Sequence, residues 1–196
     1  MKYIFLGSAF ILLVSITFTL SSIIIDYFHE PDVIPVPIEV VEEEIVILEE
    51  LSTFKQDLRC LAMNIYHEAR SDSLAGQVAV ADVVLNRVES KRYPNTICEV
   101  VHQSKLRTNW LGKVVPSINK CQFSWYCDGK SDEPKNIEAW ESAKELSRNL
   151  LTNDTFRGIT EGSTHYHARY VKPDWIADRG MRRIGSIGEH VFYRWH

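Results

Sequence analysis

An uncharged apolar stretch near the start of the chain divides the sequence into parts that must fold in different solvents. Tyr3 to Ile25 contains no Asp, Glu, Lys or Arg and is rich in Ile, Leu, Phe and Val. Its 23 residues are enough for a helix that crosses the roughly 30 Å hydrocarbon layer of a bilayer. Because Lys2 precedes the stretch and Asp26 follows it, the positive-inside rule predicts a cytoplasmic N-terminus. We therefore expect residues 1–25 to be a single-pass anchor of the cytoplasmic membrane, with the remaining chain outside it.

A cleaved signal peptide is the alternative to this anchor. The apolar region of a signal peptide usually has about 7–15 residues and ends in a small-x-small cleavage site. Here Ser21 and Ser22 are followed by Ile23, Ile24 and Ile25, which makes a poor site. The anchor is the favoured interpretation, although scattered Ser and Thr lower its hydrophobicity and leave open a later release from the membrane.

Residues 26–54 form an acidic segment after the expected anchor. They include nine Asp and Glu but no Lys or Arg, and Pro31, Pro35 and Pro37 prevent a helix in the first half. We expect an extended, solvated stalk, with a short helix or a β-like segment over Val40–Leu51.

The four cysteines take their meaning from the expected location. In an oxidising compartment, Cys60, Cys98, Cys121 and Cys127 indicate two disulfides, which three connectivities can form. Cys121 and Cys127 enclose five residues and are the easiest pair, and Cys60 with Cys98 would then join two helices. Zinc binding is the alternative, but the spacings contain no C-x2-C knuckle, and we expect no metal.

Residues 55–196 are assigned to one mostly helical α+β domain. They carry 21 Lys and Arg against 17 Asp and Glu, a mildly basic balance that suits an anionic polymer at long range.

Trp125, Trp140 and Trp175 are assigned to the core. From apolar spacing and caps we expect helices over Leu58–Arg70, Leu74–Glu89 and Ile137–Leu151, a short helix after Thr96, a surface loop over Gln103–Lys120, a strand or loop over Cys121–Tyr126, and strands over Thr164–His167 and His190–Trp195.

One carboxylate, Glu68, lies where an apolar residue is expected. Leu61, Ile65 and Glu68 share one face of the first helix of this domain, so that the acid is on the stripe that faces the interior. Burial raises the pKa of a carboxyl group, and a carboxyl that keeps its proton near neutral pH can act as a general acid. The alternative is a structural Glu that pairs with Arg59 or Arg70.

Several short motifs follow one another along this domain. They are YHEAR (66–70), GQVAVA (76–81), VLNRV (84–88), YPNTIC (93–98) and QFS (122–124), and then YH (166–167), Trp175 and IGEHVFY (187–193). In this order they resemble the motifs of the SleB-type cell-wall hydrolases, which are the spore-cortex-lytic enzymes and their relatives in bacteria and phages. The resemblance runs from about Cys60 to Tyr193.

The resemblance implies a lysozyme-related fold and cleavage of peptidoglycan between N-acetylmuramic acid and N-acetylglucosamine. The catalytic acid of the family is matched by Glu68. Its members resemble lytic transglycosylases, in which one carboxyl group serves as both acid and base. A hydrolase would need a second carboxylate, at ~5–5.5 Å for retention or ~6.5–9.5 Å for inversion. Candidates for it are Asp72, Asp82, Asp128, Asp174 and Asp178, none of them on a matched motif.

Further residues are expected to contact the sugar. Aromatic rings beside amides suit the faces of sugar rings, so Gln122, Phe123 and Tyr166 are placed in the cleft wall. Asn86 and Arg87 either hydrogen-bond sugars or brace the helix that carries Glu68. The candidate substrate-binding residues are Tyr66, Gln77, Asn86, Arg87, Gln122, Phe123, Tyr166, His167 and His190.

Three other functions stay open. The first is a glycan hydrolase with a second carboxylate, and the second is a non-catalytic peptidoglycan-binding or assembly protein. The third is a zinc amidase with His165, His167 and Glu68 as ligands, although no further His or Cys has the spacing of a ligand motif. The expected partners are peptidoglycan and the cytoplasmic membrane, which residues 3–25 would contact. No cofactor and no nucleic acid are expected, since a periplasmic location offers little nucleic acid.

Overall fold

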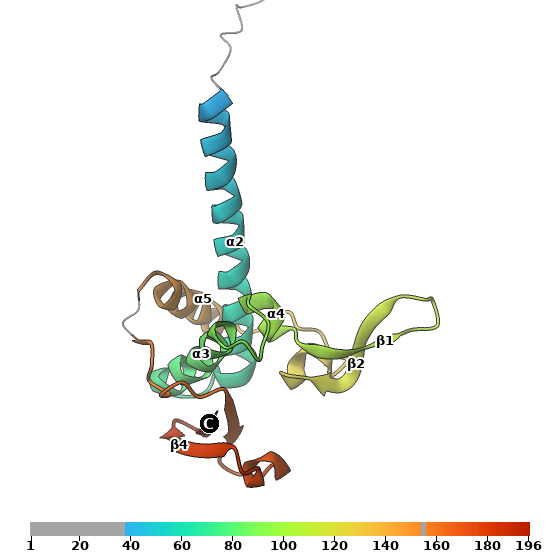
Figure 1. The fold of residues 1–196 in the computed structure, drawn as a ribbon, viewed down its shortest axis with the longest axis vertical. Helices are drawn as coiled ribbons and strands as arrows, with labels where there is room; N and C mark the ends of the chain where they lie inside the picture. Colours follow the sequence, from blue (N-terminus) through green and yellow to red (C-terminus); the bar gives the residue numbers. More distant parts are fainter. Residues whose placement is uncertain (1–37, 154–155) are drawn as a thin grey trace, which may run out of the picture. The chain divides into compact units, whose positions relative to one another are not determined.

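The computed structural model describes residues 38–153 and 156–196 (Figure 1). The expected anchor and the proline-containing half of the expected stalk lie outside the described residues. The chain divides into two compact units, residues 1–45 and residues 46–196, and the following concerns the second. Within the described residues, none of the helices is both long and apolar enough to cross a bilayer.

The second unit combines helices with two small antiparallel sheets, which confirms the α+β class. The helices are α2 (Ile38–Ala69, which begins in the first unit), α3 (Leu74–Glu89), α4 (Ile97–Val101) and α5 (Ile137–Thr152), with 3-10 helices η1 (Ser124–Cys127) and η3 (Asp174–Ala177). The strands are β1 (Ser104–Thr108), β2 (Val114–Cys121), β3 (His165–Ala168), β4 (Met181–Ile187) and β5 (His190–Trp195).

Helix α2 is longer than the sequence analysis expects. It includes the whole of Val40–Leu51, so the β-like interpretation of that segment is wrong, and it continues without a break to Ala69. The reason is local, because no Gly or Pro occurs between Ile38 and Ala69 and the acidic residues of this segment are mostly Glu, a good helix former. The catalytic candidate Glu68 therefore lies in the last turn of a 32-residue helix.

Helix α3 is the central element of the domain. The hydroxyl oxygen of Ser73 caps its start by accepting the N–H of Gly76 at 3.2 Å. Val78 and Val84 pack into the helical core, whereas Val83 packs against Phe192 of β5 on another side. A helix that lies between two apolar layers is buried nearly all round.

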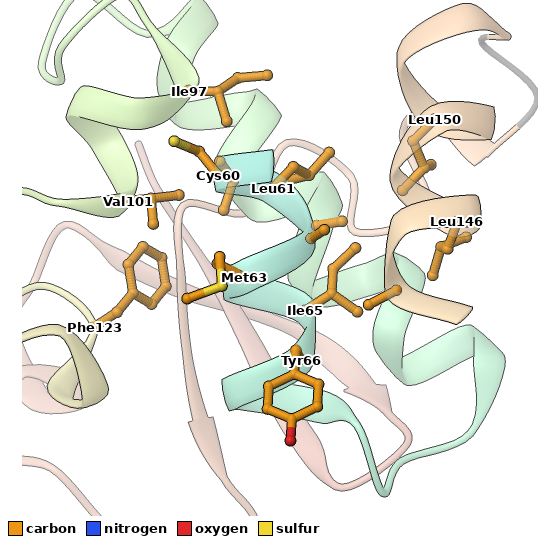
Figure 2. Packing of buried hydrophobic residues seen from close by; sticks show 14 of the residues in the cluster. Cys60, Leu61, Met63, Ile65, Tyr66, Ile97, Val101, Phe123, Leu146 and Leu150 are labelled. Carbon is orange, nitrogen blue, oxygen red and sulfur yellow. The ribbon is translucent and has the colours of Figure 1, made fainter. Parts of the chain in front are cut away.

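The helical core surrounds the last turns of α2. Figure 2 shows Met63 beside Phe123, and Ile65 facing α5, where Leu146 and Leu150 lie. Leu61 and Ile65 have no exposed surface. Burial of such side chains supplies the main stabilisation of a domain of this size.

Both expected disulfides are present. Cys60–Cys98 joins α2 to α4 with a Cα–Cα distance of 5.2 Å, and Cys121–Cys127 joins the end of β2 to η1. The first links two core elements and the second closes a short corner of the chain.

The expected tryptophan core is only partly correct. Trp125 is 8% exposed and packs in the core, and its indole N–H donates to Asn64 Oδ1 at 3.4 Å. Trp140 packs at the edge of the core, edge-on to Tyr66. Trp175 is half-buried in η3 and lies against Tyr193 of the second sheet rather than in the helical core.

Two antiparallel sheets complete the fold. The three-stranded sheet has the order β3-β5-β4 and pairs Tyr166 with Phe192 and Ala168 with His190. Strands β1 and β2 form a separate hairpin over most of the segment expected to be a loop, so that expectation is wrong. Residues 122–127, which follow the hairpin, contain a 3-10 helix instead of a strand.

Candidate active site

Glu68 lies in a cleft between the end of α2 and the three-stranded sheet. Two adjoining pockets of about 380 and about 270 Å³ share Glu68, Ala168, Tyr170 and His190 in their walls. Together they reach the size usual for small-ligand sites. The Glu68 side chain is half-buried.

The surroundings of Glu68 favour its protonated form. Burial raises the pKa of the Glu68 carboxyl, and this effect outweighs two opposing contacts. The hydroxyl of Tyr166 donates to Glu68 Oε2 at 3.2 Å, and the positive charge of Arg87 also lowers the pKa. The carboxyl thus keeps its proton to a higher pH than an ordinary Glu, with a donor and a cation ready to stabilise the carboxylate once the proton has left.

Arg87 comes from the last turn of α3 and forms part of the larger pocket. It is 2% exposed, and its Nε donates to the carbonyl oxygen of Thr164 at 2.8 Å. The guanidinium lies over the rings of Tyr93 and Phe123, 5.3 and 5.2 Å from their centroids. Its Nη1 has no hydrogen-bond partner within the described part of the chain. These contacts fix the position of the cation, which makes no direct ion pair with a residue in 38–153 or 156–196.

His190, the first residue of β5, also lines the larger pocket. Its Nδ1 lies 3.2 Å from Asp72 Oδ2, and its ring meets the Tyr166 ring edge-on at 5.0 Å. Burial lowers the pKa of His190, although the neighbouring Asp72 carboxylate opposes this effect. With Nδ1–H donated to Asp72, a neutral ring has Nε2 as a hydrogen-bond acceptor.

Asp72 is enclosed by the turn before α3 and the turn between β4 and β5. The Ser73 and Glu189 N–H groups donate to its two carboxylate oxygens at 2.6 and 2.9 Å. Burial raises the pKa of Asp72, but these hydrogen bonds and His190 outweigh it, and the net shift is downward. A Cβ atom added at Gly76 or Gly188 would lie 2.2 or 2.3 Å from the same carboxylate, so both positions require glycine for close approach.

Six of the nine candidate substrate-binding residues line the larger pocket. They are Arg87, Gln122, Phe123, Tyr166, His167 and His190. Gln122 is exposed, whereas Phe123 is buried. His167 Nε2 lies 3.1 Å from the Tyr193 hydroxyl, which orients its ring.

The other three candidates point elsewhere. The Tyr66 hydroxyl accepts the N–H groups of Lys135 and Asn136 at 2.9 and 3.0 Å, which holds the start of α5. Gln77 donates to the Asp72 carbonyl oxygen, and Asn86 donates to the Ser163 carbonyl oxygen. These contacts correct the expected sugar contact of Tyr66 and favour the bracing role for Asn86.

The structure adds residues that the sequence analysis missed. Ser124, Ala168, Tyr170 and Val171 also line the larger pocket. Tyr170 is 88% exposed, and its proximity to the Tyr-His motif is the only sequence signal for it.

Among the candidates for a second carboxylate, Asp72 alone shares a pocket with Glu68 within the described residues. Asp82 has no exposed surface and pairs with Arg157 in the interior, which removes it as a candidate. Asp128, Asp174 and Asp178 line neither pocket.

Curated relatives match most of the second unit. The spore cortex-lytic enzyme of Bacillus subtilis strain 168 is 45% identical over 136 residues, which cover 69% of this chain and 37% of the relative. That of Oceanobacillus iheyensis is 39% identical over 143 residues, which cover 70% of this chain and 41% of the relative. The chain thus spans about two fifths of the length of these relatives.

Solved structures and a family model give the same relationship. The catalytic domain of the Bacillus cereus SleB protein matches with a TM-score of 0.50 at 25% identity, over 71% of this chain and 91% of that chain. The catalytic domain of the germination-specific lytic transglycosylase SleB from Bacillus anthracis matches with a TM-score of 0.51 at 26% identity, over 70% and 93%. The model of the Cell Wall Hydrolase family matches residues 71–193. The chain therefore belongs to the Cell Wall Hydrolase family, and within it to the SleB type.

Proposed function

We propose that the protein is a lytic transglycosylase that cleaves peptidoglycan between N-acetylmuramic acid and N-acetylglucosamine, with Glu68 as its general acid and base. The observation that carries the proposal is the position of Glu68: among the described residues it is the single carboxylate in the wall of the larger pocket, and its pKa is raised. The name of the Bacillus anthracis relative supports the same chemistry.

The proposed reaction needs one carboxyl group. Glu68 donates its proton to the glycosidic oxygen, the bond between this oxygen and C1 breaks, and N-acetylglucosamine leaves with a free 4-hydroxyl. The Glu68 carboxylate then takes the proton of the muramic acid 6-hydroxyl, whose oxygen bonds to C1 and closes a 1,6-anhydro ring. The carboxyl group ends protonated, as it began, with the proton of the 6-hydroxyl in place of the one it gave away, and no water is consumed.

The neighbours of Glu68 fit both halves of this cycle. Burial keeps the carboxyl protonated before the first step. After it, the Tyr166 hydroxyl and the Arg87 charge stabilise the carboxylate until it takes the next proton. His190 Nε2 and the exposed Gln122 amide provide hydrogen bonds for the substituents of the sugar.

A hydrolase that uses Asp72 is the second candidate, because Asp72 lines the smaller pocket with Glu68. Against it, Asp72 accepts four hydrogen bonds, from the N–H and the hydroxyl of Ser73, from Glu189 and from His190, and these occupy its oxygens. An engaged carboxylate is a poor nucleophile and a poor base for water.

Product analysis in ¹⁸O-labelled water distinguishes the two reactions. We expect the wild-type protein to release anhydro-muropeptides without ¹⁸O from purified sacculi, as read by mass spectrometry. Reducing ends that carry ¹⁸O would instead establish a hydrolase. A protein that pellets with sacculi and releases nothing would point to the non-catalytic, wall-binding alternative.

Tyr166→Phe tests the proton-holding role of the site through its pH dependence. The Tyr166 hydroxyl lowers the pKa of Glu68 by favouring the carboxylate, so its removal raises that pKa. Because the acid must be protonated, we expect the alkaline limb of the kcat–pH profile to move to higher pH. Tyr126→Phe is the matched control, since Tyr126 lines neither pocket of the cleft, and it leaves the limb in place. A Tyr166→Phe limb that stays or moves to lower pH contradicts this role.

We also propose that the enzyme works in the periplasm, outside the cytoplasmic membrane and anchored to it by residues 1–25. The two disulfides support an oxidising compartment, because such bonds rarely persist in the cytosol.

A further inference from the structure

The β1–β2 hairpin has no role in the proposed reaction. In Figure 1 it extends away from the helices, and β2 packs against η1 at its base. Its large apolar side chains are exposed, and Trp110 at the tip is 90% exposed. A two-stranded hairpin is marginally stable alone in water, so an exposed apolar surface on it calls for a partner.

One face of the hairpin is mainly apolar. Leu106 pairs with Pro116 and Thr108 with Val114, and side chains directly opposite each other share a face of the sheet. This face is therefore apolar, with Leu106 64% and Val114 66% exposed. Arg107 lies on the other face by strand alternation, directly opposite Val115.

The tip continues the apolar surface. Asn109 Oδ1 accepts the N–H groups of Leu111 and Lys113 at 3.0 and 2.9 Å, which fixes the turn. Trp110 and Leu111 are consecutive residues of that turn, and both are exposed. The tip is thus an ordered apolar end rather than a polar loop.

The charge of the hairpin indicates the class of partner. Residues 103–121 contain four cations, Lys105, Arg107, Lys113 and Lys120, and no Asp or Glu. Sugar-binding surfaces combine aromatic rings with amides, whereas this face is mainly aliphatic. Aliphatic side chains, a terminal Trp and surrounding cations are the features of elements that lie in the interface of an anionic bilayer.

We infer that the β1–β2 hairpin inserts its tip and apolar face into the surface of a bilayer that contains anionic phospholipids. The inference goes beyond the proposed function and does not depend on residues 1–25. Strand β2 ends at Cys121, and the next two residues, Gln122 and Phe123, lie in the cleft wall. Docking therefore holds the cleft close to the membrane surface.

Tryptophan quenching by brominated lipids tests this with the full chain. All five Trp residues lie at position 110 or later, so residues 1–37 add no signal even if they insert into the bilayer. In vesicles of brominated phosphatidylcholine and phosphatidylglycerol we expect strong quenching of the wild type and at least about threefold less quenching of Trp110→Phe. Trp140→Phe, a half-buried position on α5, is the matched control and keeps most of the wild-type quenching.

Charge reversal completes the test. Lys105→Glu with Arg107→Glu is expected to weaken the Trp110-dependent quenching, as is omission of the anionic lipid. Equal quenching of the wild type and Trp110→Phe would overturn the inference. A second result would also overturn it: brominated lipids do not quench Trp110, but sacculi or a second copy of the chain protect Trp110 from quenching by iodide. Trp110→Phe should still release muropeptides from lipid-free sacculi, which separates failure of this inference from failure of the proposed function.

Discussion

Glu68→Gln is expected to slow the release of muropeptides from sacculi by about 10²–10⁴-fold, the contribution usual for general acid–base catalysis. Glutamine has nearly the same shape, but it can neither donate the proton that the glycosidic oxygen needs nor take the proton of the 6-hydroxyl. The wild-type rate should fall as the pH rises through the pKa of Glu68, which burial places above the ordinary 4.5. The variant should lose that pH dependence together with its activity.

The stability of Glu68→Gln separates loss of chemistry from loss of fold. A carboxyl whose folded pKa is raised favours folding below its unfolded pKa, and this contribution is lost as the pH rises through the folded pKa. At neutral pH, burial of the carboxylate form costs folding free energy. The neutral amide of glutamine removes this cost, so the thermal midpoint should stay the same or rise. Glu49→Gln, an exposed position on the same helix, is the matched control and should keep full activity. Normal muropeptide release by Glu68→Gln would remove Glu68 from its catalytic role.

Asp82→Ala is expected to lower the free energy of unfolding by about 3–5 kcal/mol, as when one partner of a buried ion pair is removed. The Asp82 carboxylate has no exposed surface, and its Oδ1 accepts a hydrogen bond from Nη1 of Arg157 at 2.6 Å. It also accepts the N–H groups of Gly158 and Thr160, both at 3.1 Å, and the Thr160 hydroxyl. Alanine leaves the buried donors of Thr160 without this acceptor and leaves the part-buried Arg157 with Glu89 as its remaining carboxylate partner. Urea unfolding at constant m-value measures the change.

Glu89→Ala is the matched control for Asp82→Ala. Glu89 binds the same guanidinium through Nη2 at 2.6 Å, but its side chain is exposed. An exposed ion pair contributes at most about 1 kcal/mol, so the control should have a small effect. Equal effects of the two substitutions would contradict the assigned importance of burial. Because the Asp82 contacts hold the segment that leads into β3, Asp82→Ala should also loosen the strand that carries Tyr166.

Local signals in the sequence predicted local structure well. Helix α3 begins and ends at the expected residues because Ser73 caps it and its apolar residues recur at helical spacing. Thr96 likewise caps α4 by accepting the N–H of Glu99 at 3.3 Å. Strand β5 was found from its alternating pattern. For the two helix starts the decisive interactions lie within a few residues of one another, whereas β5 also depends on its pairing with β3.

Interactions between distant segments were not predictable in this way. Asp82 and Arg157 are 75 residues apart, and neither belongs to a motif that names the other. The β1–β2 hairpin lacks a continuous alternation and contains Pro116, so its pairing appears only in three dimensions. Arg87, Tyr166 and His190 come together beside Glu68, although no spacing in the chain requires it.

Membership of one motif does not place two residues of a helix in the same site. Tyr66 and Glu68 belong to the same motif, but two residues along a helix correspond to a rotation of about 200°. Their side chains must therefore leave the helix on nearly opposite sides. Glu68 faces the cleft, and Tyr66 faces the core and the start of α5.

The enclosure of Asp72 has a practical consequence for transplanting this site. Gly76 belongs to the first turn of α3 and Gly188 to the β4–β5 turn, and any side chain at either position would strike the same carboxylate. The two turns therefore enclose the same Asp72 side chain from two sides. A chimaera that takes either turn from a homologue must keep glycine at that position, or His190 loses the contact that orients it.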